Sequence, residues 1–248
     1  MKWPLVFMGA ALTAALTWGQ SAQAQTEGQF VRAIKQDNPS ALQELLAEGF
    51  DPNTKDEHGQ PGIVMALHED SYRAAKALAA SPKLKIDETD ANGQNALMMA
   101  AWAGQLDIAK ELVAKGAAVN KAGWTPLHYA ASKATDGEVA MIRYLLLLGA
   151  DINAGSPNGT TPLMMAAAYG SPDAVKLLID SDADIGKRNQ QDMTALDFAK
   201  RYERPDAIKM LTQAGQVKAA KRSGSSSSET PPAVKLAAPV ASAAGGVK

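Results

Sequence analysis

The sequence predicts an all-α solenoid of about six stacked helix-turn-helix units joined by short β-hairpin loops. The first observation is a twelve-residue phrase that occurs as "GQNALMMAAWAG" at 93–104, "GWTPLHYAASKA" at 123–134 and "GTTPLMMAAAYG" at 159–170. The second is the spacing of the anchor residues of this phrase, which lie 34, 30, 36 and 33 residues apart and so centre on a period of 33. These anchors are Gly59, Gly93, Gly123, Gly159 and Asp192.

The first 24 residues differ from the repeats and have the order of a secretory signal peptide. Lys2 supplies an early charge, an apolar stretch covers 5–16, and Ala22-Gln23-Ala24 forms a small-residue cleavage site. A membrane anchor is the competing interpretation, but spanning a bilayer takes about 20 apolar residues. This stretch is shorter and is interrupted by Gly9. We therefore expect cleavage after Ala24, a periplasmic location and no membrane insertion of the mature chain.

Each central unit begins with a turn followed by a first helix whose start is recognisable. Thr125 and Thr161 precede Pro126 and Pro162, which places a capping hydroxyl before a proline at the first helical position. Alanines follow, because neighbouring first helices pack closely. A second helix then ends in an apolar cluster such as "MIRYLLLLGADIN". No unit buries this face alone, so the stability of the stack is a sum over neighbours.

Smaller features complete the expected units. Gly104 and Gly170 are predicted to end first helices in a conformation suited to glycine. The pairs Met98/Met99 and Met164/Met165 are expected to fill the core, with the second methionine in the apolar slot.

Two units depart from the period. The unit that begins at Gly93 is three residues short in its final loop, and the next gains three between its helices, over 132–138. Such changes on one surface of a solenoid often mark a binding region, although drift in a surface loop explains them equally well.

This pattern resembles the ankyrin repeat. The match is closest in "GWTPLHYAA" at 123–131, and "GTTPLMMAAAYG" and "LLLLGADIN" add to it. The resemblance covers 28–215 and implies an ankyrin repeat domain behind a signal peptide at 1–24. It also implies that His128, in the His slot of "TPLH", hydrogen-bonds locally and links adjacent repeats. The implied units are an N-terminal capping repeat at 28–58, repeats at 59–92, 93–122, 123–158 and 159–190, and a C-terminal capping repeat at 191–215.

The C-terminal segment 216–248 is rich in Ser, Pro, Ala and Gly, lacks apolar periodicity and is predicted to be a disordered tail. It carries five basic residues and one acid, whereas 25–215 has 19 basic and 25 acidic residues. A flexible tether and a basic binding segment are both compatible with this composition.

Catalytic and cofactor-binding motifs are absent from the sequence, which has no GxSxG, HExxH, Walker or GxGxxG pattern. The chain has no cysteine, which excludes disulfides, thiolate metal sites and a cysteine nucleophile. His58 and His68 lack the spacing of a metal site. Since 25 basic residues balance 26 acidic ones, neither nucleic acid nor a membrane surface is favoured. We expect no enzyme activity, cofactor, metal or nucleic-acid partner.

The resemblance implies that a partner protein binds the hairpin tips and the inner, concave face of the first helices. The hairpin-tip candidates are Gln60, Gln94, Trp124, Thr160 and Met193. The first-helix candidates are His68, Trp102, Lys133, Tyr169 and Tyr202. Exposed large aromatics are common interface anchors, so Trp102, Trp124 and Tyr169 are expected side by side in one patch. Partial packing under a neighbouring repeat is the alternative for each ring.

Two classes of function follow. In the first, the chain is a monomeric, non-catalytic periplasmic protein that docks another exported protein as a scaffold or accessory factor, or that holds a toxin or enzyme inactive as an immunity protein. In the second, it is an envelope tether whose basic tail contacts anionic polymers. The identity of the partner is not written in the sequence.

Overall fold

The computed structural model of the protein describes residues 25–224, so the expected signal peptide and the segment 225–248 lie outside the described residues. Within this range the chain forms six consecutive helix pairs, and the first of them comprises a helix over 25–35 and α2, Pro39–Ala47. The remaining helices are α3 (Gly62–His68), α4 (Tyr72–Ala80), α5 (Ala96–Trp102), α6 (Leu106–Ala114), α7 (Pro126–Ala130), α8 (Glu138–Leu147), α9 (Pro162–Tyr169), α10 (Pro172–Asp180), α11 (Ala195–Arg201) and α12 (Pro205–Gly224).

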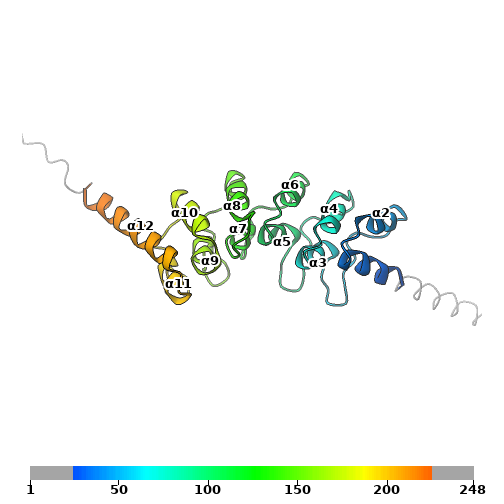
Figure 1. Ribbon diagram of the computed structural model, residues 1–248, viewed down its shortest axis with the longest axis horizontal. Coiled ribbons are helices and arrows are strands. Elements are labelled where there is room, and N and C mark those ends of the chain that lie inside the picture. Colours follow the sequence, from blue (N-terminus) through cyan, green and yellow to red (C-terminus); the bar gives the residue numbers. More distant parts are fainter. Residues whose placement is uncertain (1–24, 225–248) are drawn as a thin grey trace, which may run out of the picture.

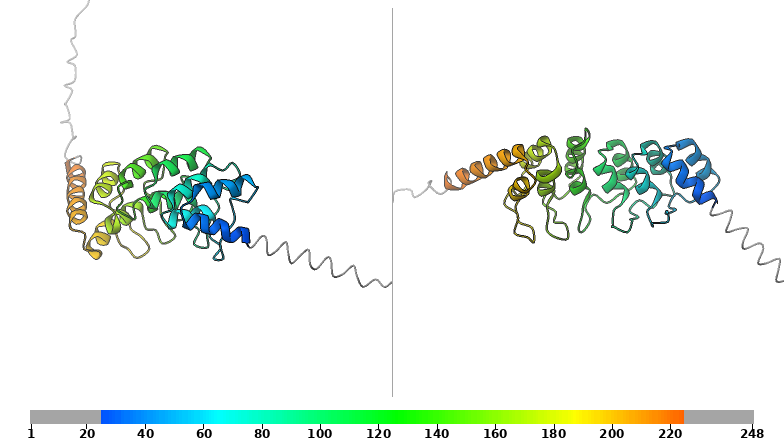
Figure 2. Two further views of the ribbon diagram at one scale, coloured as in Figure 1. Left: turned by 45° about the vertical axis from the view of Figure 1, so that its right-hand side comes forward. Right: turned by 60° about the horizontal axis from the view of Figure 1, so that its bottom comes forward.

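The pairs stack side by side in chain order and form an open, elongated array (Figure 1). The first helices of the pairs, from α3 to α11, form one row, and α2 to α10 form the other. The connecting loops project from the first-helix row (Figure 2). Among the described residues, pairing between extended segments is limited to isolated bridges at Lys55–Pro61 and Thr89–Asn95. The predicted all-α repeat solenoid is therefore confirmed.

The first helices begin as their sequences predict. The hydroxyl of Thr161 accepts a hydrogen bond from the backbone N–H of Met164, with Pro162 at the first helical position of α9. The small residues behind it are fully packed, since Ala166 and Ala167 are buried between neighbouring helices. Close approach of first helices therefore explains why the repeated phrase keeps alanine at these positions.

A left-handed residue ends several first helices. Gly104 has a φ of +69°, and Asp37, Asp70 and Glu203 adopt the same conformation at the corresponding turn of other units. The expectation was wrong for Gly170, whose φ of −75° is open to any residue. Glycine is required there for space, because a Cβ would lie 2.9 Å from the Cα of Ala166 and 3.0 Å from the carbonyl oxygen of Ala131.

The three-residue insertion packs against the neighbouring unit. A Cβ on Gly137 would lie 2.1 Å from the carbonyl oxygen of Gly104, so the two backbones touch. The side chain of Thr135 covers the same turn, where its hydroxyl is buried. Glu138 follows at the start of α8 and is 1% exposed, and both of its carboxylate oxygens accept from the backbone N–H of Ser171 at 3.1 Å. The inserted loop therefore joins three successive units.

The last helix is longer than predicted. α12 runs from Pro205 to Gly224, so the expectation of disorder from residue 216 was wrong for 216–224. The segment "VKAAKR" consists mostly of strong helix formers, and it extends the helix beyond the capping repeat. This end of α12 projects past the last unit (Figures 1 and 2). Three of the five basic residues assigned to the tail therefore lie on a helix.

Candidate protein-binding surface

The first-helix row and the loops that project from it carry the predicted contact residues, and we call this surface the first-helix face. It comprises α3, α5, α7, α9, α11 and the loops that precede them. Most residues of these helices are buried and hold the stack together, so this face is formed by side chains at the ends of the helices, such as Trp102 and Tyr169, and by the loops. The predicted aromatic residues fall into three clusters on this face.

The first cluster is centred on Trp102, at the end of α5. Its indole is half-buried and stacks with the ring of His68 from α3, with centroids 6.3 Å apart. On another side, the ammonium of Lys133 lies 3.6 Å from the centre of the indole. A cation this close to an indole face is held by the ring quadrupole. Three predicted residues from three consecutive units are therefore in contact.

The second cluster surrounds Trp124, which precedes α7. The indole meets the ring of His128 edge-on at 5.3 Å and that of Tyr129 at 6.5 Å. Met165, on α9, lies on the other side of a hollow of about 150 Å³ that opens to solvent between units four and five. The lining of this Trp124 hollow is completed by Ser132.

His128 forms a wall of the hollow and is 1% exposed. Its Nδ1 accepts from the backbone N–H of Thr125 at 3.2 Å and lies 2.8 Å from the hydroxyl of the same residue. Because Thr160 offers only a carbonyl oxygen at 2.9 Å, Nε2 carries the hydrogen and donates it. Burial lowers the pKa of His128 below its ordinary value and keeps the ring neutral. The imidazole therefore links two repeats, as the resemblance implied.

The third cluster joins Tyr169, at the end of α9, with Tyr202, which follows α11. Their rings meet at 4.8 Å, the hydroxyl of Tyr169 donates to that of Tyr202 at 2.6 Å, and each residue is 40% exposed. The shared hydrogen bond, together with partial burial, raises the pKa of Tyr169 to about 12. The phenol of Tyr169 is thus neutral at physiological pH, and the two rings present an amphipathic, exposed aromatic pair.

The hairpin-tip candidates differ in their exposure. The side chain of Gln94 donates to the hydroxyl of Tyr129 at 3.1 Å, which ties one tip to the Trp124 hollow, and Gln60 is half-buried at another tip. Thr160 does not belong to the surface, because it is only 3% exposed. Its backbone N–H is held by Ser156, and its carbonyl is held by His128. The expectation that Thr160 faces outward was therefore wrong.

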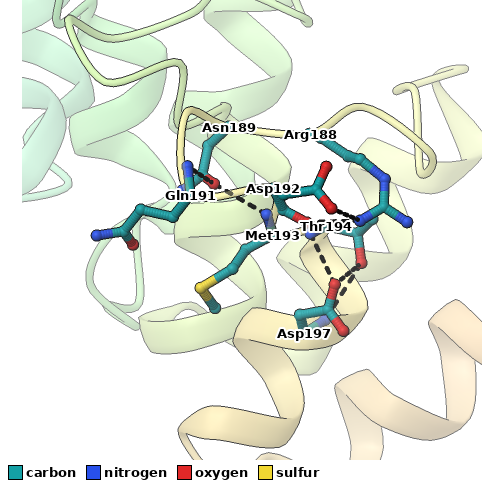
Figure 3. A network of polar contacts seen from close by, with 7 residues as sticks. All are labelled: Arg188, Asn189, Gln191, Asp192, Met193, Thr194 and Asp197. Atoms are coloured by element: carbon teal, nitrogen blue, oxygen red, sulfur yellow. Dashed lines mark hydrogen bonds and ion pairs between the residues drawn. The ribbon is translucent and has the colours of Figure 1, made fainter.

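Met193 occupies the tip before α11, which Figure 3 shows in detail. The side-chain oxygen of Asn189 accepts from the backbone N–H groups of Gln191 and Met193, both at 3.0 Å, and this fixes the turn. Asp197 accepts from the N–H and hydroxyl of Thr194 at 2.9 and 2.7 Å, and these bonds lower the pKa of its carboxyl. Met193 is held at the tip by this network and stays half-buried.

The three clusters correct the expectation of one continuous patch. Trp102, Trp124 and Tyr169 each contact different partners, and the two indoles are half-buried rather than fully exposed. Tyr129 and Met165 were missed as surface residues. Both residues occupy the position after the His slot. Met165 was missed because the second methionine of each pair was assigned to the core, whereas in this pair the first, Met164, is the buried residue. A comparison of that slot across the units, where Tyr129 replaces methionine, was the available signal.

Residues 25–224 contain no group of three or more His, Asp or Glu side chains placed to hold a metal ion. In that range, too, no helix combines the length and apolarity needed to cross a bilayer.

Comparison with known proteins supports the geometry. The family described as "Ankyrin repeats (3 copies)" matches residues 30–122, 63–156 and 134–222. "Ankyrin repeat and SAM domain-containing protein 6" of Rattus norvegicus is 32% identical over 126 residues, which are 49% of this chain and 14% of that protein. "Protein phosphatase 1 regulatory subunit 27" of Mus musculus is 40% identical over 83 residues, 32% of this chain and 52% of that protein. The chain thus spans only part of the length of these relatives.

A solved structure gives the wider match. It is titled "Bd0816 Predatory Endopeptidase from Bdellovibrio bacteriovorus in complex with immunity protein Bd3460", and one of its chains superposes with a TM-score of 0.62 at 26% identity. The match covers 75% of this chain and 97% of that one. Since the repeated phrase, the paired helices and the family match agree over most of its length, this chain belongs to the ankyrin repeat family.

Proposed function

We propose that this protein is an exported, non-catalytic binding protein that docks another exported protein on its first-helix face. Ankyrin repeats mediate protein–protein interaction, so binding as such follows from the family. The observation that carries the choice of surface is the Trp124 hollow, which opens to solvent and is lined by aromatic and methionine side chains from two successive units. Pockets of this kind accept the anchor side chains of a partner.

The electrostatics of the surface favour a partner with apolar anchors. Both nitrogens of His128 are engaged, and the hydroxyl of Ser132 donates to the carbonyl of Tyr129 at 2.8 Å. Few polar groups of the hollow therefore need to be satisfied by a ligand. Tyr169 and Tyr202, one unit further along, add exposed ring area with a hydroxyl at its edge, which suits the rim of an interface.

Among the roles such a protein plays, inhibition of an enzyme is favoured over passive scaffolding by one observation. The solved structure that matches this chain is a complex of an endopeptidase with an immunity protein. The tether hypothesis is less favoured, because the basic residues Lys218 and Lys221 lie on α12 rather than in a separate tail. Export itself depends on the signal sequence. N-terminal sequencing of the periplasmic protein is expected to begin at Gln25, and a chain that keeps Met1 in the membrane contradicts export.

Capture from a periplasmic extract tests the binding surface. Residues 25–248 serve as bait, and Trp124→Ala is compared with Leu147→Ala, which removes an 82%-exposed leucine from the other helix row. Truncation of an interface anchor costs about 2 kcal/mol or more, which is more than tenfold in affinity. We expect Trp124→Ala to lose the partner and Leu147→Ala to keep it, with both variants folded by circular dichroism. Equal capture by the two variants contradicts the proposed surface.

The captured partner then distinguishes inhibition from scaffolding. Its enzymatic activity is measured alone, with the wild-type chain and with the Trp124→Ala chain. An inhibitor suppresses the activity only when its surface is intact. Activity that is unchanged or raised by the wild-type chain rules out inhibition and leaves the scaffold role.

A further inference from the structure

The Trp124 hollow has a lining whose polar groups are already satisfied, with one exception. The hydroxyl of Tyr129 accepts from Gln94, so its own hydrogen is left to donate to an acceptor. An occupant matched to this site has an apolar side chain or ring, no hydrogen-bond donor in the hollow, and a carbonyl oxygen near Tyr129. A proline within an extended peptide has these properties, because it lacks an N–H and its neighbours expose their carbonyls. Aromatic-lined grooves recognise proline-containing segments in this way.

The chain carries such a segment after α12. Residues 225–248 include "TPPAVKLAAPV" at 230–240, with prolines at 231, 232 and 239 and no acidic residue after Glu229. The length of chain decides which proline reaches the hollow. The hollow lies two units before α11, about 20 Å along the stack, and the projecting end of α12 adds between about 10 and 30 Å. The path from Gly224 is therefore between about 30 and 50 Å.

An extended chain covers about 3.3 Å per residue. Pro231 and Pro232 follow Gly224 by seven and eight residues and so reach only about 25 Å, short of the hollow. Pro239 and Val240 follow by 15 and 16 residues and reach about 50 Å, which is sufficient. The segment that both fits the chemistry and covers the distance is "LAAPV", at 236–240.

We infer that residues 236–240 of the same chain occupy the Trp124 hollow, with Pro239 against the indole, and so compete with the partner protein for the first-helix face. This regulation rests on the proposed function, since it acts at the same surface. Tethering makes docking of the segment intramolecular, and its effective concentration is set by how closely the length of the linker matches the span. A partner protein that binds the same surface more tightly displaces the segment.

Tryptophan quenching tests the occupancy directly. In residues 25–248 the tryptophans are Trp102 and Trp124, so Trp102→Phe leaves Trp124 as the single reporter. In that background, Pro239→Ser with Val240→Ser is compared with the matched pair Pro231→Ser with Pro232→Ser. We expect acrylamide quenching of Trp124 to rise at least twofold in the first variant and to stay at the unsubstituted level in the second.

Three results overturn the inference: quenching that is unchanged in the Pro239 variant, quenching that rises equally in both variants, or a difference that depends on protein concentration. The last result assigns the segment to a second copy of the chain. Capture by the same variants separates this inference from the proposed function. A Pro239 variant that captures partner as the unsubstituted chain does contradicts competition, whereas a quenching change with no capture by any variant leaves the tail docked and refutes the partner proposal.

Discussion

The close contact between Gly104 and Gly137 predicts that a larger residue at position 137 of the inserted loop destabilises the protein. Gly137 has φ −91° and ψ −5°, which alanine adopts without strain. Its Cβ, however, would lie 2.1 Å from the carbonyl oxygen of Gly104 and 2.9 Å from the carbonyl carbon. Because both partners are backbone, no side-chain rotation relieves the clash. Gly137→Ala must therefore separate the two units by an ångström or more.

The magnitude follows from this geometry. Overpacking a well-packed site costs about 1–3 kcal/mol, and a clash with rigid backbone belongs at the upper end. For a domain of this size about 3 kcal/mol corresponds to a fall in melting temperature of about 6–12 °C. Gly215→Ala is the matched control, because it is the same substitution inside α12 and a Cβ there meets nothing within 4 Å. Alanine is a better helix former than glycine by about 0.5–1 kcal/mol, so the control is expected to melt slightly higher.

The assay is thermal unfolding followed by circular dichroism at 222 nm for both variants and the wild type. Opposite shifts, with a large loss for Gly137→Ala, support a loop that is packed for structure. If the melting temperature of Gly137→Ala lies within about 1 °C of that of the wild type, the inserted loop is not packed against the backbone of Gly104, and a structural role for the insertion is refuted.

Three further predictions concern contacts between repeats. The pKa of His128 is lowered in the folded protein, so as the pH falls the unfolded chain takes up a proton first, and the stability that the neutral imidazole contributes is complete above pH 6.5 and is lost below it. His128→Asn should therefore flatten the loss of melting temperature between pH 7 and 5.5. An unchanged slope contradicts this expectation. Burial raises the pKa of Glu138 above 4.5, so ionisation of its carboxyl at higher pH costs the folded state stability. The melting temperature of Glu138→Gln relative to wild type should therefore rise from pH 4 to pH 7. A fall in this difference argues against a desolvated carboxylate. The side chain of Asn120 accepts a hydrogen bond from the backbone N–H of Asp151 and donates one to the carbonyl of Gly149, both at 2.9 Å. Asn120→Ala should lower the free energy of unfolding in urea by about 1–2 kcal/mol. No measurable loss of stability means that water replaces these bonds.

The fold was predictable because each unit repeats the same local sequence signals for helix starts and helix contacts. Thr161 followed by Pro162 marks a helix start, paired alanines mark a close helix contact, and a 33-residue period requires that these contacts recur between neighbours. The end of α12 was not predictable from the repeat. Residues 216–224 follow the last repeat, so the period does not extend to them, and residues that favour helix continue α12 there.

The candidate surface was predicted in its positions more than in its exposure. Trp102, Lys133, Tyr169 and Tyr202 all lie on the first-helix face, because their slots are set by the period. Burial, in contrast, depends on the neighbouring unit. Thr160 is covered because its carbonyl receives the hydrogen bond of an imidazole 32 residues away, and nothing within its own repeat indicates this.

The two departures from the repeat period meet at α7. The shortened loop ends at Gly123, directly before Trp124 and three residues before the start of this helix, and the inserted segment begins at Ser132, two residues after its end. Trp124 and Ser132 are also two of the residues that line the hollow. Stacking alone requires neither change, since units that keep the common length bury their helices equally well. In the inserted segment, Gly137 packs against the neighbouring unit, whereas Ser132 and Lys133 belong to the first-helix face. Trp124, which follows the shortened loop, belongs to the same face. A loop of the common length at either end of α7 would alter the lining of the hollow while leaving the period of the stack intact.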